Sequence, residues 1–456
     1  MRTPAMRGPA TTWRYDALKR LVADERLPLM LVDLDVLERN TRRLADVAAE
    51  AGMTLRVASK SLRVPDLIRR VMEVGAPTIR GLMCFSAAEA SLLHDSGFDD
   101  LLIAYPTVQT SDLDLLWELR RRGADVSLMI DSPAHVARLQ TWWADRLGGG
   151  ADQVHGGADR ASGGADRASG GAGQVDGGDN QASGGDGPRL PVCIDVDMSY
   201  RPLRGLDPGL GPHLGVQRSP VRDLDGLRAV VNAVRGAPAL RLRGVMGYEA
   251  QIAGLGEANP FTPLLNPVKR LFKARSTQNV AERRHAIRRF LDAEGFSGLL
   301  FNGGGTGSLG TTTREPWLTE VTAGSGFLQS HLFDYFDANR NEPACCFALQ
   351  VTRVPEPGVI TCHSGGFIAS GEICPDKAPV VLVPAGLTPL GAEGFGEVQT
   401  PLRVPPSVHL DPGDPVFCRP AKAGEIAERF DEYLLVRDGK RVGRAKTYRG
   451  LGHCFY

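Results

Sequence analysis

The stretch that decides the fold is residues 53–64, which reads Met-Thr-Leu-Arg-Val-Ala-Ser-Lys-Ser-Leu-Arg-Val. Apolar residues alternate with others up to Val57 and predict a short strand, and this run stops at Lys60. A helical pattern then follows over residues 66–73. Lys60 is therefore expected where a strand passes into a helix, which is the edge where barrels of alternating strands and helices place their chemistry.

A lysine at such a position has two interpretations. For a lysine considered alone, a solvated or salt-bridged loop side chain is the more common outcome. The alternative is an amine that nearby apolar surface and positive charge keep partly unprotonated, so that it can form a Schiff base. The motifs found elsewhere in the chain favour the second interpretation for Lys60.

The chain after this stretch repeats the alternation of strand and helix. Strands are predicted at 54–59, 78–85, 101–105, 125–131, 190–196, 240–247, 298–302 and 318–322. Helices are predicted at 65–74, 86–96, 110–122, 132–147, 220–235 and 267–294. Such alternation is typical of a parallel sheet covered by helices, and eight units of this length predict an α/β fold with a closed (β/α)8 TIM barrel. A doubly wound open sheet is the alternative.

The composition divides the chain into further regions. Residues 1–28 are an N-terminal extension, 29–327 hold the barrel, and 328–456 have the short strands and frequent prolines of an all-β C-terminal domain. Strands of that domain are predicted at 345–354, 358–362, 379–383, 404–410, 415–418 and 433–437. The early strand 29–32 is a candidate member of the same domain. Residues 148–187 are a Gly/Ala/Asp/Ser low-complexity insertion that we predict to be disordered, because almost no large apolar residue is present.

Charge and hydropathy exclude several functional classes. Lysine plus arginine equals aspartate plus glutamate, 53 against 53, so no overall field favours nucleic acid or an anionic membrane. No apolar run reaches membrane-spanning length, and residues 1–16 lack the apolar core of a signal peptide. The eight cysteines form no Cys-x-x-Cys pair and predict reduced thiols. We therefore expect a soluble cytoplasmic protein with neither nucleic-acid nor membrane partners.

A glycine-rich segment, Phe-Asn-Gly-Gly-Gly-Thr-Gly-Ser at 301–308, follows the seventh predicted barrel strand. Consecutive glycines let backbone N–H groups converge on an anion, and Thr306 and Ser308 add hydroxyl donors. Barrels often bind phosphate with the loops after strands seven and eight, and Ala-Gly-Ser-Gly at 323–326 follows the eighth. A flexible surface loop is the alternative. The match of 305–310 to a dinucleotide fingerprint is rejected, because no good helix opening follows it.

The predicted barrel strands end in further polar side chains: Asp195, Asp197, Tyr248, Glu249 and Gln251. Asp195 and Asp197 share one strand face, and Asp197 is nearer the rim. Several such groups on one rim, together with Lys60 and a phosphate loop, predict a binding pocket. An amine and a phosphate site on one barrel face indicate either a sugar-phosphate aldolase or a pyridoxal-phosphate (PLP) enzyme.

The order of several motifs resembles the fold-type III, alanine racemase-like PLP enzymes, and among them the D-threonine aldolase and D-serine dehydratase branch. The motifs are Asp33-Leu34-Asp35 with Leu37 and Asn40, Arg56-Val57-Ala58-Ser59-Lys60, Phe85-Ser86-Ala87-Ala88-Glu89-Ala90, Gly247-Tyr248 and the glycine-rich segment at 303–308. The resemblance covers most of 29–327, and the short predicted strands and frequent prolines of 328–456 agree with the β-domain of that family.

The resemblance implies a role for each matched residue. Lys60 matches the lysine that holds PLP as a Schiff base, and the phosphate cup is matched by Gly304, Gly305, Thr306 and Ser308. Tyr248 matches a tyrosine of the cofactor pocket, and Gln251 lies where relatives have a histidine. Asp197, at the rim, is a further cofactor-binding candidate. The family is typically dimeric, with each β-domain contributing to the neighbouring active site, so we expect a homodimer.

The sequence departs from the family at the metal site. Relatives that act on β-hydroxy D-amino acids hold a divalent metal through a histidine and a nearby cysteine or aspartate in the C-terminal domain, whereas residues 419–425 contain no histidine. This segment does not support a metal site. Lys422 supplies a fixed positive charge there, serves as a second acid or base, or is an exposed loop lysine. His363 is an alternative ligand or base, although a single histidine in a glycine-rich turn is more often structural.

The resulting hypothesis is a PLP-dependent lyase or deaminase that acts on a small amino acid, of D configuration or β-hydroxylated, through a Lys60 Schiff base. Lys60 is the expected base on one face of the substrate, and Lys422, His363 or Tyr448 on the other. Deamination, retro-aldol cleavage and racemisation all remain open. The alternatives are an amino acid racemase, a non-catalytic PLP-binding protein, and a lysine aldolase that binds no cofactor.

Overall fold

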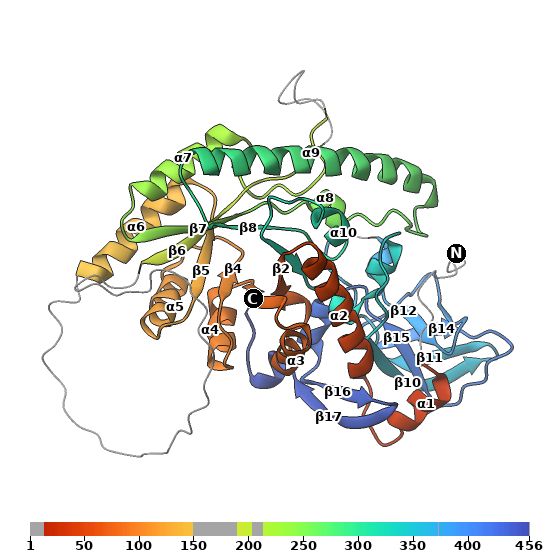
Figure 1. Cartoon of the computed structure of the whole chain (residues 1–456). Helices are drawn as coiled ribbons and strands as arrows, with labels where there is room; N and C mark the ends of the chain where they lie inside the picture. Colours follow the sequence, from red (N-terminus) through yellow and green to blue (C-terminus); the bar gives the residue numbers. More distant parts are fainter. Residues whose placement is uncertain (1–12, 149–188, 203–212, 373, 456) are drawn as a thin grey trace, which may run out of the picture.

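The computed structural model describes residues 13–148, 189–202, 213–372 and 374–455. The disordered insertion predicted at 148–187 lies outside these residues from 149 onward, as does the start of the N-terminal extension. Two units are visible in Figure 1: a barrel surrounded by helices, and a mixed β-sheet to its lower right. One cluster of buried apolar side chains extends through both units, from Leu55 in the barrel to Tyr433 in the sheet.

The barrel is closed and built from parallel strands, as predicted, so the open-sheet alternative is wrong. Its strands are β2 (Thr54–Ala58), β3 (Ile79–Cys84), β4 (Leu101–Ile103), β5 (Val126–Ile130), β6 (Leu190–Asp195), β7 (Leu240–Met246), β8 (Leu300–Gly303) and β9 (Glu320–Ala323). The ring closes where β2 pairs with β9, with Leu55 opposite Val321. Aliphatic runs form these strands because both of their faces are buried, as in β5, whose five residues are all buried.

Helices cover the outside of the barrel. They are α2 (Leu34–Glu50), α3 (Pro65–Gly75), α4 (Ala87–Asp95), α5 (Thr110–Arg121), α6 (Pro133–Gly148), α7 (Leu224–Arg235) and α9 (Asn266–Ala293), with the short helices α8 (Ala250–Ala253), α10 (Leu309–Thr312) and α11 (Ser325–Leu328) at the rim. Local signals begin several of them: Ser86 accepts a hydrogen bond from the Glu89 amide, and Pro65 is the first residue of α3. None of the described helices combines the length and apolar character that a membrane crossing requires.

The second unit is a nine-stranded mixed sheet. Its strands are β1 (Leu29–Asp33), β10 (Cys345–Glu356), β11 (Val359–His363), β12 (Val380–Val383), β13 (Thr388–Pro389), β14 (Gln399–Arg403), β15 (Pro415–Arg419), β16 (Glu432–Arg437) and β17 (Lys440–Lys446). β1 lies between β10 and β16, with Met30 opposite both Phe347 and Tyr433. The strand before the barrel therefore belongs to the C-terminal sheet, and the first barrel strand begins only at Thr54.

Some predicted elements differ from the observed ones. The strand predicted at 404–410 is wrong, because the strand is β14 at Gln399–Arg403 and the following Pro405 and Pro406 have no N–H group to donate to a ladder. β17 was not predicted, since its residues are mostly charged and exposed. The described part of the N-terminal extension holds a helix, α1 (Tyr15–Leu21). All eight cysteines are described and none forms a disulfide.

The two units meet at the turn that carries Lys60. The 3-10 turn η1 (Ser59–Ser61) packs against the short helix α12 (Ala423–Ile426) of the C-terminal domain. The approach is so close that a Cβ on Gly424 would lie 1.8 Å from the Lys60 carbonyl oxygen. Two further links hold the same region: the Tyr448 amide donates to the Arg63 carbonyl (3.0 Å), and Arg63 pairs with Glu428 (2.7 Å). The C-terminal domain thus contacts the backbone of Lys60 directly.

Replacing Gly424 by Ala should separate α12 from the Lys60 turn, because the added methyl group meets rigid backbone. We expect a loss of at least about 3 kcal/mol in unfolding free energy, measured by urea denaturation. Gly391→Ala is the matched control, since a Cβ there meets no atom within 4 Å. Equal stability of the two variants would contradict the close contact.

Candidate active site

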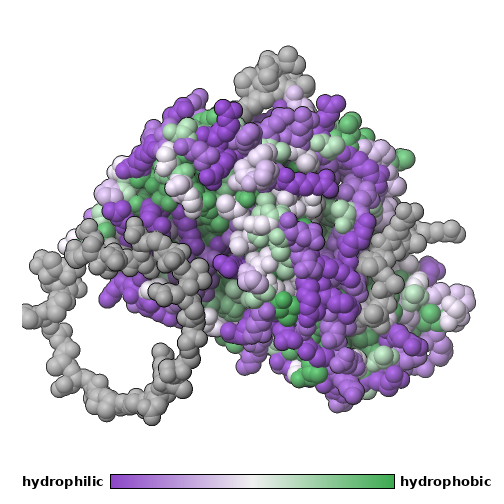
Figure 2. Space-filling model, viewed as in Figure 1, coloured by the Kyte–Doolittle hydropathy of each residue, from purple (hydrophilic) through white to green (hydrophobic). Residues whose placement is uncertain are grey.

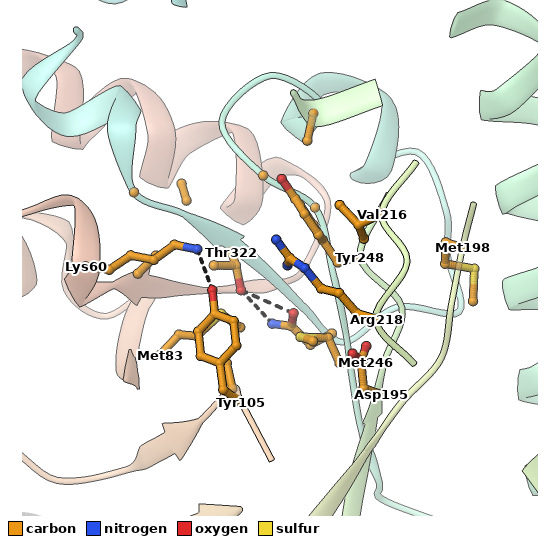
Figure 3. Close-up of a pocket in the computed structure, with 18 of the residues that line it drawn as sticks. Lys60, Met83, Tyr105, Asp195, Met198, Val216, Arg218, Met246, Tyr248 and Thr322 are labelled. Carbon is orange, nitrogen blue, oxygen red and sulfur yellow. Dashed lines mark hydrogen bonds between the residues drawn. The ribbon is translucent and has the colours of Figure 1, made fainter. Parts of the chain in front are cut away.

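A cavity of about 380 Å3 opens at the carboxyl ends of the barrel strands, and we call it the rim cavity. The residues discussed below that line it include Lys60, Tyr105, Asp195, Arg218, Tyr248 and Thr306. In Figure 3, Lys60 and Arg218 extend into this cavity from opposite sides, with Tyr105 below the Lys60 amine and Tyr248 beside Arg218. The structure thus brings the lysine of the first barrel strand and the glycine-rich loop after β8 to one site.

The Lys60 amine reaches into the rim cavity and donates a hydrogen bond to the Tyr105 hydroxyl at 2.8 Å. Tyr105 follows the barrel strand β4. Burial works to raise the pKa of Tyr105, but the neighbouring Lys60 ammonium outweighs it, so the pKa is lower than usual. The tyrosine therefore orients the Lys60 amine.

A buried carboxyl group supports the Lys60 turn from behind. Glu89 is fully buried and accepts hydrogen bonds from the Phe85 amide (2.6 Å) and the Tyr448 hydroxyl (2.8 Å). Burial raises the pKa of Glu89 to about 7, with these hydrogen bonds opposing the shift. Tyr448, named above as a candidate base, is buried against Glu89 and does not line the rim cavity. The Phe85–Ala90 motif therefore positions the lysine turn.

The glycine-rich loop rests on a buried ion pair. Glu249 accepts hydrogen bonds from the Gly304 amide (3.1 Å) and the Ser308 hydroxyl (2.6 Å), and it pairs with the fully buried Arg284. Burial raises the pKa of Glu249, but Arg284 and the hydrogen bonds more than compensate, so the pKa is lowered. Ser308 is turned toward Glu249 and does not line the rim cavity. Its role in this structure is to hold the loop.

Backbone forms the wall of the rim cavity beside this loop. The Thr306 hydroxyl accepts from the Gly326 amide (3.0 Å), which joins the loops after β8 and β9. A Cβ on Gly305 would lie 2.9 Å from the Ala253 Cβ, and one on Gly324 would lie 2.5 Å from the Ser61 hydroxyl oxygen. Side chains are thus excluded from a recess of glycine backbone. Its amides at Gly304, Gly305 and Gly326 donate in this structure to Glu249, Ser308 and Thr306, and they reach an anion by exchanging these bonds. An aldehyde cofactor with a phosphate group fits such a recess beside a lysine.

The predicted aspartates and Gln251 take different places. Asp197 lines the rim cavity, but its carboxylate accepts from the Ser199 amide and hydroxyl (both 2.8 Å) and pairs with Arg222 at 3.4 Å. It organises the loop after β6. Gln251 does not line the cavity and donates to the Met198 carbonyl at 2.6 Å. Burial and neighbouring aspartates raise the pKa of Asp195, which does line the cavity, to about 7.

A second cavity of about 970 Å3 lies between the barrel rim and the C-terminal domain, and we call it the interdomain cavity. It shares Lys60 and Tyr248 with the rim cavity, and Lys422 lines it. The Lys422 amine donates to Glu425 (2.9 Å) and to the Ser370 carbonyl (2.8 Å). His363 ends β11, is exposed, and lines neither cavity.

The donor set around Lys422 does not fit a metal ion. An ammonium group stands there, paired with Glu425, and no described part of the chain gathers three or more His, Cys, Asp or Glu side chains that could share an ion. We therefore derive no step through a metal.

Tyr105 and Arg218 are among the rim-cavity residues that sequence reasoning missed. Tyr105 is the last residue of a strand predicted at 101–105, so its place at a strand end was a usable signal. Arg218 lies in a loop between β6 and α7 that carries no strand or helix pattern, so nothing in the sequence marked it. Only the folded chain brings it opposite Lys60.

Comparison with known proteins identifies the fold. No protein-family model matches the chain. A segment of 112 residues is 30% identical to 3-hydroxy-D-aspartate aldolase of Paracoccus denitrificans, and the match spans 25% of this chain and only 28% of that relative.

Similar solved structures cover nearly the whole chain. D-threonine aldolase from Filomicrobium marinum has a TM-score of 0.69 at 19% identity, covering 95% of this chain and 98% of that one. D-threo-3-hydroxyaspartate dehydratase from Delftia sp. HT23 has a TM-score of 0.64 at 17% identity, and the match covers 94% of this chain and 98% of that one. Alanine racemase from Bacillus anthracis has a TM-score of 0.56 at 14% identity, and the match covers 93% of this chain and 98% of that one. These likenesses confirm the fold expected from the resemblance.

Glu89→Gln should weaken the pH dependence of stability. The Glu89 pKa is about 7 in the folded chain against an ordinary 4.5, so the stability that accompanies its protonated form is complete below about pH 4.5 and is lost as the pH rises to about 7. The shift corresponds to about 3 kcal/mol. Urea unfolding at pH 5 and pH 8 should show a smaller difference for Glu89→Gln than for wild type. Glu73→Gln, at an exposed helical position, should keep the wild-type difference.

Proposed function

From the type III, alanine racemase-like fold of this chain, we propose that it is a PLP-dependent lyase or deaminase acting on a small amino acid of D configuration or with a β-hydroxyl group. Lys60 is the Schiff-base lysine of this proposal. The observation that carries it is that the Lys60 amine and the backbone-walled recess of the glycine-rich loop line one cavity. Type III enzymes of this fold work with PLP.

The residues that would hold the cofactor follow from the lining of the rim cavity. Lys60 would bind its aldehyde, and its phosphate would lie against Gly304, Gly305 and Thr306, three of the residues proposed from the sequence. Burial and Glu249 raise the pKa of Tyr248 to about 12, so its hydroxyl stays protonated and can donate a hydrogen bond. When bound, PLP supplies an electron sink for a bond that breaks at the amino acid Cα.

The chain's own groups would move the protons. The Lys60 amine, oriented by Tyr105, is the base proposed for one face of the substrate. Lys422 borders the adjoining interdomain cavity and is the proposed second acid or base. His363 is the weaker candidate for this role, because it is exposed and lines neither cavity. Asp197, Ser308 and Gln251 support these residues through the contacts described above.

The relatives support the reaction class. One is named an aldolase of 3-hydroxy-D-aspartate, and the similar structures include a D-threonine aldolase and a D-threo-3-hydroxyaspartate dehydratase. All three names refer to β-hydroxy amino acids of D configuration. The aldolases cleave the Cα–Cβ bond, and the dehydratase removes the β-hydroxyl group. Such a substrate is what we propose for this chain.

Lys60→Ala should abolish both the visible absorption of the holoprotein and its turnover. The amine that would bind the cofactor aldehyde is then missing, while the recess is intact. Absorption spectra after addition of PLP measure the first effect. The second is measured by release of ammonia and aldehyde from D-serine, D-threonine and D-3-hydroxyaspartate and from their L forms.

Three controls sharpen this experiment. Lys269→Met should keep both signals, since Lys269 does not line the rim cavity and donates to Thr262. Lys422→Met should keep the absorption and lose turnover at least tenfold if Lys422 is the second acid or base. The wild-type assay is repeated with a chelator to test for metal. An absorption band that survives in Lys60→Ala would contradict the assignment.

We also propose a homodimer. The start of α9 and the turn before it expose apolar side chains beside the interdomain cavity: Leu264, Leu265, Val268 and Leu271. Figure 2 shows apolar atoms at the surface over this end of α9. Burial of such a patch against a second copy would stabilise the pair.

Light scattering should give twice the monomer mass for wild type. The double variant Leu264→Glu/Leu271→Glu should give the monomer mass, because it places two charges in the apolar patch. A monomeric wild type would contradict the proposal.

A further inference from the structure

Arg218 is the feature of the rim cavity that the proposed function leaves without a role. It is the one arginine that lines this cavity among the described residues, and its guanidinium makes no hydrogen bond or ion pair with any of them. Neighbouring arginines are engaged: Arg222 pairs with Asp197, and Arg284 with Glu249 and Glu315. A cation presented to a cavity without a hydrogen bond or ion pair to any described residue indicates an anionic ligand.

The backbone beside Arg218 is held in place. The Ser219 hydroxyl donates to the Asp195 carbonyl (2.7 Å) and accepts from the Val221 amide (3.0 Å). The Asp197 amide in turn donates to the Val221 carbonyl (2.8 Å). These bonds tie the loop to the end of β6, next to the residue that carries the guanidinium. Binding an anion there costs little backbone entropy, because the residues next to Arg218 are already held by these bonds.

The charges around the guanidinium decide where an anion can lie. Figure 3 shows Arg218 beside Tyr248 and above Asp195, reaching toward the side of the cavity that Lys60 enters. Three carboxyl groups also line this cavity. Asp197 is paired with Arg222, whereas the other two, Asp131 and Asp195, repel an anion. The favourable region is therefore between the two cations, Lys60 and Arg218, and away from the two carboxyl groups.

The chemistry of an amino acid matches this arrangement. Its amine must come to the Lys60 end of the cavity, and its carboxylate is attached to the same Cα. Guanidinium is planar and binds a carboxylate through two parallel hydrogen bonds. We propose that Arg218 binds the carboxylate of the amino acid and so selects amino acids over amines. This inference rests on the proposed function and adds the residue that recognises its substrate class.

The cofactor is the other source of negative charge in the same cavity. Its phosphate already has the backbone-walled recess of Gly304, Gly305 and Gly324. A second guanidinium contact to the cofactor would make Arg218 a cofactor residue and not a selector of substrate. Measurements of PLP affinity and of substrate affinity separate the two.

The test uses holoprotein and two matched pairs of probes: D-serine with ethanolamine, and D-threonine with 1-aminopropan-2-ol. Each amine lacks only the carboxylate. Dissociation constants are measured from changes in the visible absorption of the bound cofactor, and the PLP dissociation constant is measured on cofactor-free protein. Variants are Arg218→Gln, Arg218→Lys and the charge-matched control Arg228→Gln, an exposed residue on α7 that pairs with Asp225.

We expect wild type and Arg228→Gln to bind at least one of the amino acids ten times or more tightly than its amine. Arg218→Gln should reduce this ratio to near one, Arg218→Lys should give an intermediate ratio, and the PLP dissociation constant should change less than threefold. The inference would be overturned, and the proposed cofactor chemistry left intact, if Arg218→Gln kept the wild-type ratio of amine to amino acid dissociation constants, or if wild type showed no preference for the amino acids. A tenfold loss of PLP affinity in Arg218→Gln at an unchanged ratio would also overturn it. A wild type that takes up no PLP would overturn the proposed function and this inference together.

Discussion

The packing of two structural units on one turn of backbone sets the position of the Lys60 amine. Gly424 of the C-terminal domain approaches the Lys60 carbonyl so closely that no side chain fits between them. The Arg63–Glu428 ion pair and the bond from the Tyr448 amide to the Arg63 carbonyl fasten the same turn. A lysine side chain has four rotatable bonds, so a fixed backbone is the first condition for a fixed amine.

Buried polar groups extend this constraint around the rim cavity. Glu89 joins the Phe85 amide to the Tyr448 hydroxyl behind the lysine, and so connects barrel and sheet domain through one carboxyl group. On the other side, the Glu249–Arg284 pair holds the glycine-rich loop from below. Each of these groups has its partners, which is what the low dielectric of a protein interior requires. The site is therefore rigid at its walls, while Lys60 and Arg218 face the open space between them.

The C-terminal domain shapes the site although Phe333 is its one residue among those that line the rim cavity. It contributes Lys422 to the interdomain cavity and closes the chain back onto the barrel, where the Phe455 ring packs edge-on to Phe85 at 6.0 Å between centroids. β1 adds to this connection, since the strand that precedes the barrel is an interior strand of the sheet. The two units thus form one body, held by both ends of the chain (Figure 1).

The sequence by itself determined the parts of this protein that depend on local pattern. Aliphatic runs of five or six residues, separated by amphipathic helices, can bury their faces only in a helix-covered parallel sheet, so the barrel and the strand ends that carry Lys60, Asp195 and Tyr248 were predictable. Only the tertiary structure decided what those residues face. Ser308 turns to Glu249, Tyr448 to Glu89, and Arg218 enters the rim cavity from a loop without periodicity. The physical reason is that strand and helix periods specify which face of an element is buried, whereas hydrogen-bond partners and cavity-lining charges come from segments far apart in the sequence, by 59 residues for Ser308 and Glu249 and by 359 for Tyr448 and Glu89.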